Sequence, residues 1–266
     1  MAQGELSPLV VQAVSENQRQ YERSRKAVVL KFALGGALVS LALWLIQDHG
    51  HSKTSDTPTG SYVCGVSNST AGYVKLANKQ DDHYFYWFYE SRSTPETDPL
   101  VLWLTGGPGS SSMFALLTEN GPCTIQPDLS TKLNPYSWNN NANVIWLDQP
   151  TGVGFSFGSP ADKDYNETNV GENIYWFLQG FLSQHPQYRG REFFVIGESY
   201  GGHYVPAAAH YIWSKNKVEN VAGQVPDMNL QGFAIGNGLT NPVIQVSRCL
   251  AVGDHVCFEV RCITVS

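Results

Sequence analysis

Four short apolar runs constrain the fold of this chain more than any other feature. Each leads into a glycine or an aspartate, and together they cover residues 99–104, 143–147, 193–196 and 230–235. Continuous apolar runs of this length are typical of strands buried on both faces of a sheet. Helix candidates at 170–185 and 202–215 alternate with them. The alternation predicts an α/β fold with a mostly parallel sheet.

A β-hairpin is expected ahead of the first buried run. Aromatic and β-branched residues at 71–77 and 83–90 flank a polar stretch at 78–82. The overall composition, 42% hydrophobic and 15% charged, suits a folded globular core rather than a disordered chain. The net charge of -6 and the lack of a large basic cluster argue against a nucleic-acid partner.

An apolar stretch near the N-terminus predicts a membrane-directed segment. Residues 27–46 contain one charge, Lys31, and a helix needs about 20 apolar residues to cross a bilayer. A basic cluster at 23–26 precedes the stretch and predicts that residues 1–26 stay in the cytosol. We expect a retained signal anchor at 27–46, and a cleaved signal peptide is the alternative.

Both interpretations deliver the rest of the chain to a lumenal or extracellular space. Residues 47–61 are polar and predict a linker between membrane and globular domain. The sequons at Asn68 and Asn166 are compatible with N-glycosylation there. The expected location is therefore the lumenal side of the endomembrane system, in a lysosome or vacuole, or outside the cell.

The motif Gly-Glu-Ser-Tyr-Gly at 197–201 lies between the run 193–196 and the helix candidate 202–215. Strand, G-x-S-x-G and helix in this order predict a nucleophile elbow, a sharp turn that exposes the hydroxyl of Ser199. Side chains in place of the two glycines would strike the adjacent strand or helix. The N-terminus of the following helix would offer N–H groups to a developing oxyanion. An ordinary strand-to-helix turn is the alternative.

A second glycine-rich segment, Thr-Gly-Gly-Pro-Gly-Ser-Ser-Ser at 105–112, follows the run 99–104. In a fold with a nucleophile elbow, the second oxyanion donor comes from the loop after this strand. Glycines let the backbone approach a substrate carbonyl closely. The segment lacks the lysine of a P-loop and the spacing of a dinucleotide motif, so no nucleotide cofactor is expected.

Other polar residues receive structural interpretations. His203 and His210 lie on the helix candidate behind Ser199, and Asp148 is expected to be a buried hydrogen-bond acceptor at a strand end. No cysteine pair has C-x-x-C spacing, so we expect no metal and no cofactor. Because the number of cysteines is odd, at least one thiol stays free or pairs between chains. The five are Cys64, Cys123, Cys249, Cys257 and Cys262.

Five stretches between about residues 72 and 242 occur in a characteristic order. They are Leu-Trp-Leu-Thr-Gly-Gly-Pro-Gly at 102–109, Asn-Pro-Tyr-Ser-Trp-Asn at 134–139, Leu-Asp-Gln-Pro with Gly-Val-Gly-Phe-Ser at 147–156, the elbow at 197–204, and Ile-Gly-Asn-Gly-Leu-Thr at 235–240. In this order and spacing they resemble the serine carboxypeptidases of the carboxypeptidase Y and cathepsin A type.

The resemblance implies an α/β-hydrolase fold over residues 62–245 and removal of C-terminal residues from peptides and proteins through an acyl-enzyme. It implies Ser199 as nucleophile and the N–H groups of Gly107 and Tyr200 as oxyanion hole. It also implies a site for the terminal carboxylate of the substrate. Two adjacent carboxyl groups there cannot both ionise cheaply, so acidic pH suits the site. Its implied residues are Trp103, Thr105, Gly106, Glu119 and Glu198.

The chain departs from the family pattern in three places. Thr105 stands where asparagine is commonest, and Ser110 replaces a cysteine of a familiar disulfide. The family's triad continues with Asp and His far downstream, whereas the resemblance fades near Gln245. We therefore expect a C-terminally truncated α/β-hydrolase fold followed by a divergent tail at 246–266. The adjacent pair Asp254 and His255 is not expected to replace the triad, because neighbouring side chains point apart.

Three functions remain open. The first is a serine-type carboxypeptidase whose present chain lacks the triad Asp and His. The second is a catalytically inert, membrane-tethered half-domain with an exposed sheet edge. The third is an acyltransferase or esterase on the same fold. The Gly-Gly-Pro loop and Glu198 favour the peptidase. The expected partners are peptide or protein C-termini and, through residues 27–46, a membrane.

Overall fold

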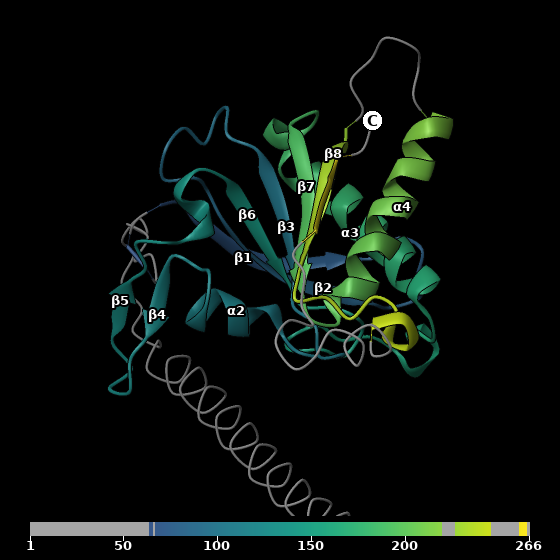
Figure 1. Ribbon diagram of the computed structural model, residues 1–266. Coiled ribbons are helices and arrows are strands. Elements are labelled where there is room, and N and C mark those ends of the chain that lie inside the picture. The colour runs from purple at the N-terminus through teal and green to yellow at the C-terminus, as the bar shows by residue number, and fades with distance from the viewer. Residues whose placement is uncertain (1–63, 66, 220–226, 246–260, 265–266) are drawn as a thin grey trace, which may run out of the picture. The chain divides into compact units, whose positions relative to one another are not determined.

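The computed structural model describes residues 64–65, 67–219, 227–245 and 261–264 (Figure 1). All of them belong to the unit formed by residues 60–266. The predicted cytosolic tail, membrane anchor and linker lie outside the described residues. Within the described ranges, no helix combines the length and apolar character needed to cross a bilayer.

A seven-stranded mixed sheet forms the core of this unit. In spatial order its strands are β1 (Ser69–Lys75), β2 (His83–Tyr89), β6 (Asn143–Leu147), β3 (Leu100–Leu104), β7 (Glu192–Glu198), β8 (Asn229–Gly236) and β9 (Arg261–Thr264). The four predicted apolar runs are β3, β6, β7 and β8, and they pair in parallel. The α/β fold class is thereby confirmed.

The sheet is less parallel than the sequence predicted. The hairpin β1–β2 is present as expected, and a two-strand hairpin is necessarily antiparallel. Strand β2 continues antiparallel to β6, and β9 runs antiparallel to β8. Only the four central strands, β6, β3, β7 and β8, pair in parallel, and α3 and α4 cross over between β6 and β7 and between β7 and β8.

Helices α3 (Glu167–Gln184) and α4 (Gly201–Glu219) cover one face of the sheet (Figure 1). Their apolar side chains pack on the inward residues of β2, β3, β6 and β7. The two helices approach closely at Gly171, where an added Cβ would lie 2.6 Å from the carbonyl oxygen of Ala207. Fully buried residues of this layer include Phe177, Phe181, Leu178, Ile174 and Ile212.

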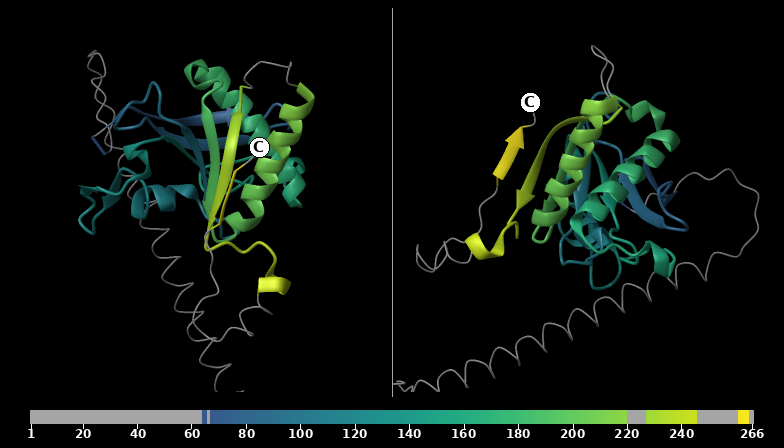
Figure 2. Two further views of the ribbon diagram at one scale, coloured as in Figure 1. Left: turned by 45° about the horizontal axis from the view of Figure 1, so that its top comes forward. Right: turned by 90° about the vertical axis from the view of Figure 1, so that its right-hand side faces the viewer.

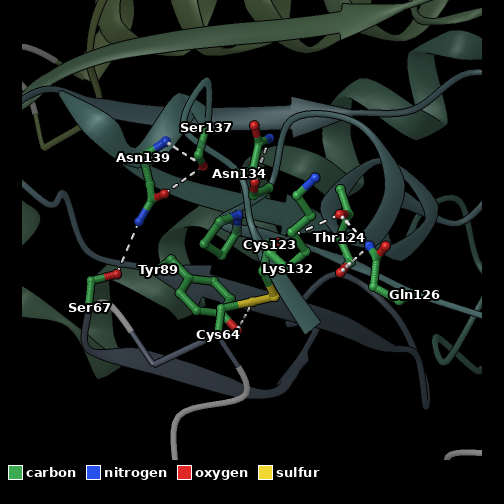
Figure 3. The surroundings of a disulfide bond; sticks show 12 residues. Cys64, Ser67, Tyr89, Cys123, Thr124, Gln126, Lys132, Asn134, Ser137 and Asn139 are labelled. Carbon is green, nitrogen blue, oxygen red and sulfur yellow. Dashed lines mark hydrogen bonds between the residues drawn. A yellow bond between two sulfur atoms is a disulfide. The ribbon is translucent and has the colours of Figure 1, made fainter. Parts of the chain in front are cut away.

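The opposite face carries shorter elements that the sequence analysis did not predict. They are α2 (Ser112–Thr118) and a hairpin of β4 (Cys123–Ile125) and β5 (Thr131–Leu133). Three 3-10 helices are also present, η1 (Trp138–Asn140), η2 (Pro160–Asp162) and η3 (Pro186–Tyr188), and residues 242–245 form a short helical turn. A disulfide between Cys64 and Cys123 ties the segment before β1 to β4, and the Tyr89 hydroxyl contacts the Cys64 sulfur (Figure 3).

Strand β9 belongs to the segment that the sequence analysis treated as a divergent tail. It pairs with β8 over four residues, from Gly232 opposite Thr264 to Ile235 opposite Arg261 (Figure 2). The half-domain hypothesis implied that the edge at β8 would be exposed, whereas β9 pairs with it here. Unpaired backbone groups at an edge accept any extended segment that can be brought alongside, so a short stretch without family resemblance can fill the position.

Candidate active site

Ser199 occupies a sharp turn between β7 and α4. Its φ is +55°, in the left-handed region that costs a non-glycine residue roughly 1–2 kcal/mol. The turn is held by the backbone at and after the end of β8: Ser199 N donates to Gly236 O at 2.9 Å, and Leu239 N donates to Ser199 O at 2.8 Å. The side chain of Ser199 is exposed. The backbone strain therefore serves to present a bare hydroxyl, as a nucleophile elbow requires.

The glycines of the elbow differ in how tightly they are packed. A Cβ on Gly197 would lie 2.4 Å from Leu104 O, which no backbone tolerates. At Gly201 the nearest atom is the same oxygen at 3.2 Å, so this position is only tight. The stricter contact comes one residue later, where a Cβ on Gly202 would meet Leu239 O at 2.6 Å. The predicted steric need holds at Gly197, and Gly202 shares it.

The glycine-rich loop after β3 packs directly against the elbow. A Cβ on Gly106 would lie 2.4 Å from Tyr200 N and 2.7 Å from Glu198 O, so only glycine fits here. Gly107 follows with φ +113° and is exposed. Among the described residues, no hydrogen bond uses the N–H of Gly107 or of Tyr200. The loop that carries Gly107 is thus in direct contact, through Gly106, with the elbow that carries Ser199 and Tyr200.

A pair of carboxyl groups lies beside the elbow. Glu119 ends α2 and Glu198 ends β7, and their side chains share a hydrogen bond. Partial burial of the carboxyl group, the charge of Glu198 and the shared hydrogen bond together raise the pKa of Glu119 to about 7. The pair therefore holds a proton at acidic pH, as expected for two carboxyl groups in contact.

Two further predicted residues lie at the end of β3. Trp103 donates its indole N–H to the Thr105 hydroxyl at 2.9 Å, and both residues are buried. Thr105 N in turn donates to Ser112 Oγ at 3.1 Å. The Thr105 side chain is thus oriented by the indole, which fixes the start of the glycine-rich loop.

Asp148 holds the C-terminal end of the same loop through hydrogen bonds. It is completely buried at the end of β6 and accepts hydrogen bonds from Ser111 Oγ at 2.5 Å and Ser112 N at 2.9 Å. These residues begin α2, immediately after the glycine-rich loop. The predicted role of Asp148 as a buried acceptor is confirmed.

Comparison with known proteins identifies the family. A sequence profile of the serine carboxypeptidases matches residues 63–255. The chain belongs to the serine carboxypeptidase family. A "serine carboxypeptidase-like" protein of Oryza sativa subsp. japonica is 49% identical over 177 residues, which cover 66% of this chain and 40% of the relative. "Serine carboxypeptidase S10 family member 1" of Dictyostelium discoideum is 45% identical over 190 residues, 69% of this chain and 44% of the relative.

A solved structure supports the same assignment. The prohormone-processing carboxypeptidase KEX1(delta)p of Saccharomyces cerevisiae superposes with a TM-score of 0.63 at 30% identity. The match covers 72% of this chain and 43% of the yeast chain. The chain thus spans about two fifths of the length of these serine carboxypeptidases, and the predicted resemblance is confirmed.

In the described part of this carboxypeptidase-family chain, no histidine side chain forms a hydrogen bond with Ser199. His203 stacks on the ring of Tyr200, with centroids 4.3 Å apart and an interplanar angle of 7°. His210 is exposed and packs beside Trp213. Asp254 and His255 lie outside the described residues. The predicted structural role of His203 agrees with its contact to Tyr200.

Sequence reasoning missed one polar contact of the site. The Tyr200 hydroxyl donates to Glu167 Oε1 at 2.9 Å, although 33 residues separate the two. No local pattern marks Glu167, which the sequence shows only as the middle residue of a sequon. Among the described residues, no cluster of three His, Cys, Asp or Glu side chains could hold a metal ion.

Proposed function

We propose that this chain carries the nucleophile-bearing part of a serine-type carboxypeptidase that removes C-terminal residues from peptides and proteins. The observation that carries the proposal is the exposed Ser199 at φ +55°, with Gly106 packed against the elbow it occupies. An exposed hydroxyl held in strained backbone beside two free N–H groups is the arrangement that acyl transfer needs.

In the proposed reaction, Ser199 Oγ forms a bond to the carbonyl carbon of the last peptide bond. The electron pair of the carbonyl moves to oxygen, where the N–H groups of Gly107 and Tyr200 stabilise it. The amine of the terminal residue then leaves with a proton, and water later cleaves the acyl-enzyme. A general base has to accept the hydroxyl proton. No histidine of the described residues hydrogen-bonds to Ser199, so this base is not assigned.

The Glu119–Glu198 pair supports an exopeptidase rather than an endopeptidase. A carboxyl group that keeps its proton donates a hydrogen bond to the terminal carboxylate of a substrate instead of repelling it. Gly106 packs against the backbone of Glu198, and the bond between Trp103 and Thr105 holds the residue before it. Because the pKa of Glu119 is raised to about 7, the proposal includes activity at acidic pH.

The proposed location is a lumenal or extracellular space. The Cys64–Cys123 disulfide supports an oxidising compartment. Both sequon asparagines, Asn68 and Asn166, are exposed. Mass mapping of glycopeptides from the protein secreted or retained by eukaryotic cells tests this point. Unmodified asparagines together with reduced Cys64 would contradict a lumenal location.

Labelling of the 266-residue chain with a phosphonofluoridate tests the nucleophile. We expect one label per chain at Ser199 and complete loss of labelling in Ser199→Ala. Ser183→Ala is the matched control, because Ser183 is an exposed serine whose hydroxyl bonds only to Gln179 O. Labelling that persists in Ser199→Ala, or none in the unsubstituted chain, would contradict an activated Ser199.

Substrate class is tested with one peptide in two forms, with a free C-terminal carboxylate and with a C-terminal amide. We expect release of the terminal residue from the free acid at pH 5 and at least a tenfold slower reaction of the amide, because the amide cannot use the Glu119–Glu198 pair. Equal rates would favour an esterase or acyltransferase on this fold. Cleavage inside the peptide would contradict the exopeptidase.

A further inference from the structure

The side chain of Tyr200 is held more firmly than an oxyanion donor strictly needs. Its N–H is the relevant group, yet its phenol donates to Glu167 Oε1 at 2.9 Å. Its ring stacks on His203 at 4.3 Å and meets Tyr204 edge-on at 5.1 Å. Two ring contacts and one hydrogen bond leave the side chain a single orientation, which restricts the backbone on which the N–H is carried.

Glu167 is itself fixed by the start of α3. Asn166 caps this helix, since its side chain accepts from Asn169 N at 3.0 Å. The close contact of Gly171 with Ala207 O sets the distance between α3 and α4. The acceptor therefore belongs to a rigid scaffold and not to a mobile loop. A carboxylate in the first turn of a helix is also favoured by the helix dipole.

We propose that Glu167 is a positioning residue of the site, which acts through the phenol of Tyr200 to hold the elbow N–H where an oxyanion forms. This rests on the proposed function of Ser199. Hydrogen bonds to a carboxylate are about twice as strong as neutral ones. The bond to Glu167, with partial burial and the carboxylate charge, raises the pKa of Tyr200, which favours the protonated phenol as the donor.

A double-mutant cycle tests whether Glu167 works through the phenol. The rate of phosphonofluoridate labelling is measured for Glu167→Ala, Tyr200→Phe and the double variant. We expect each single variant to be slowed on the order of tenfold, because a misplaced oxyanion donor costs rate. The double variant should be no slower than either single one. Multiplied effects, or a Glu167→Ala rate equal to that of the unsubstituted chain, would overturn the proposal.

Two further variants separate positioning from helix stability. Glu167→Gln keeps an acceptor oxygen and should recover most of the labelling rate. Glu172→Ala removes a carboxylate of the same helix that has no hydrogen bond or ion pair with the described residues of the elbow, and it should label like the unsubstituted chain. Loss of rate in Glu167→Gln equal to that in Glu167→Ala would contradict a role through the hydrogen bond.

Hydrogen exchange tests the positioning role of Glu167 without relying on the reactivity of Ser199. The amides of Gly202 and His203 donate to the carbonyl oxygens of Ser199 and Tyr200, so they report on the elbow. We expect them to exchange severalfold faster in Glu167→Ala and unchanged in Glu172→Ala. If the unsubstituted chain is not labelled, the function of Ser199 fails, and the exchange result still stands. Unchanged exchange in Glu167→Ala would overturn the positioning role.

Discussion

Asp148 and Asp82 are both completely buried, yet the chain surrounds them in opposite ways. Asp148 accepts hydrogen bonds from Ser111 Oγ, Ser112 N and, at 2.9 Å, Phe155 N. Burial raises the pKa of Asp148, and these donors oppose the rise. A buried carboxylate with three donors is a satisfied structural element, and it joins the loop after β6 to the start of α2.

Asp82 accepts fewer hydrogen bonds than Asp148. Thr151 Oγ1 donates to its Oδ2 at 2.5 Å, and its Oδ1 has no partner among the described residues. Asp162 and Asp164 lie close by, and the cation facing the group is Lys79, whose ammonium lies 3.1 Å from Asp164. Burial raises the pKa of Asp82 to about 6. Burial thus makes an ionised carboxylate costly in free energy, and the hydrogen-bond donors around the carboxylate determine how much of that cost is offset.

The largest expected effect is that of Asp148→Ala. The substitution leaves three donors without an acceptor in a buried place, which should lower the free energy of unfolding by about 3 kcal/mol or more. Urea denaturation at pH 7 measures the change, and Asp128→Ala, in an exposed turn, is the control. An Asp148→Ala protein as stable as the unsubstituted chain would break the comparison.

The sequence predicted the burial of Asp148 but not that of Asp82. Asp148 follows an apolar strand run, and a polar residue there predicts a buried acceptor. Asp82 belongs to the polar stretch 78–82, whose composition predicts an exposed turn. Its burial depends on Thr151 and Asp164, which come from a loop about 70–80 residues away. The residues next to Asp82 in the sequence therefore do not reveal these long-range contacts.

The same limit separates the predicted from the unpredicted parts of the fold. The strands of the central sheet and helices α3 and α4 follow from periodicity, since each buries a long apolar face. The β4–β5 hairpin, the Cys64–Cys123 disulfide and strand β9 do not. Each is short, and each exists because of a distant partner. At the site, the elbow glycines were readable from the motif, whereas Glu167 was not.

Lys79→Met is expected to have the second largest effect. The ammonium of Lys79 donates to Asp162 O at 2.8 Å and neutralises Asp164, both in a largely buried place. Its loss should cost about 2 kcal/mol at pH 7.5. It should also move the titration of Asp82 to higher pH, because Lys79 lowers that pKa. Lys75→Met is the control, since Lys75 pairs with Asp81 in solvent. Equal losses in the two variants would show that burial does not matter here.

Asp82→Asn should act with the opposite sign. Since the folded pKa is about 6 and the ordinary value 3.8, the folded chain binds more protons across this window, and its stability falls as pH rises through it. At pH 7.5 the variant, which has no charge to bury, should be more stable by on the order of 1–2 kcal/mol. Near pH 4 the difference should vanish. Thermal melting from pH 4 to 8 measures the difference. A variant less stable than the unsubstituted chain at pH 7.5 would refute the idea that the buried Asp82 carboxylate destabilises the fold.

The Glu119–Glu198 pair extends the comparison to carboxyl groups beside solvent, where the effect should be smallest. The raised pKa of Glu119, about 7, means that the pair loses its shared proton as pH rises past neutrality. A carboxylate substrate then meets two negative charges, so KM should rise severalfold between pH 6 and 8. Glu119→Gln keeps a hydrogen-bond donor that cannot ionise, and its KM should stay flat over this range while kcat is little changed. Glu192→Gln, exposed at the far end of β7, should follow the unsubstituted profile. If KM of Glu119→Gln rose with pH as steeply as that of the unsubstituted chain, the titrating group would not be Glu119. The proposed difference between the Glu119–Glu198 pair, which binds substrate, and Asp82, which is only buried, would then have no support.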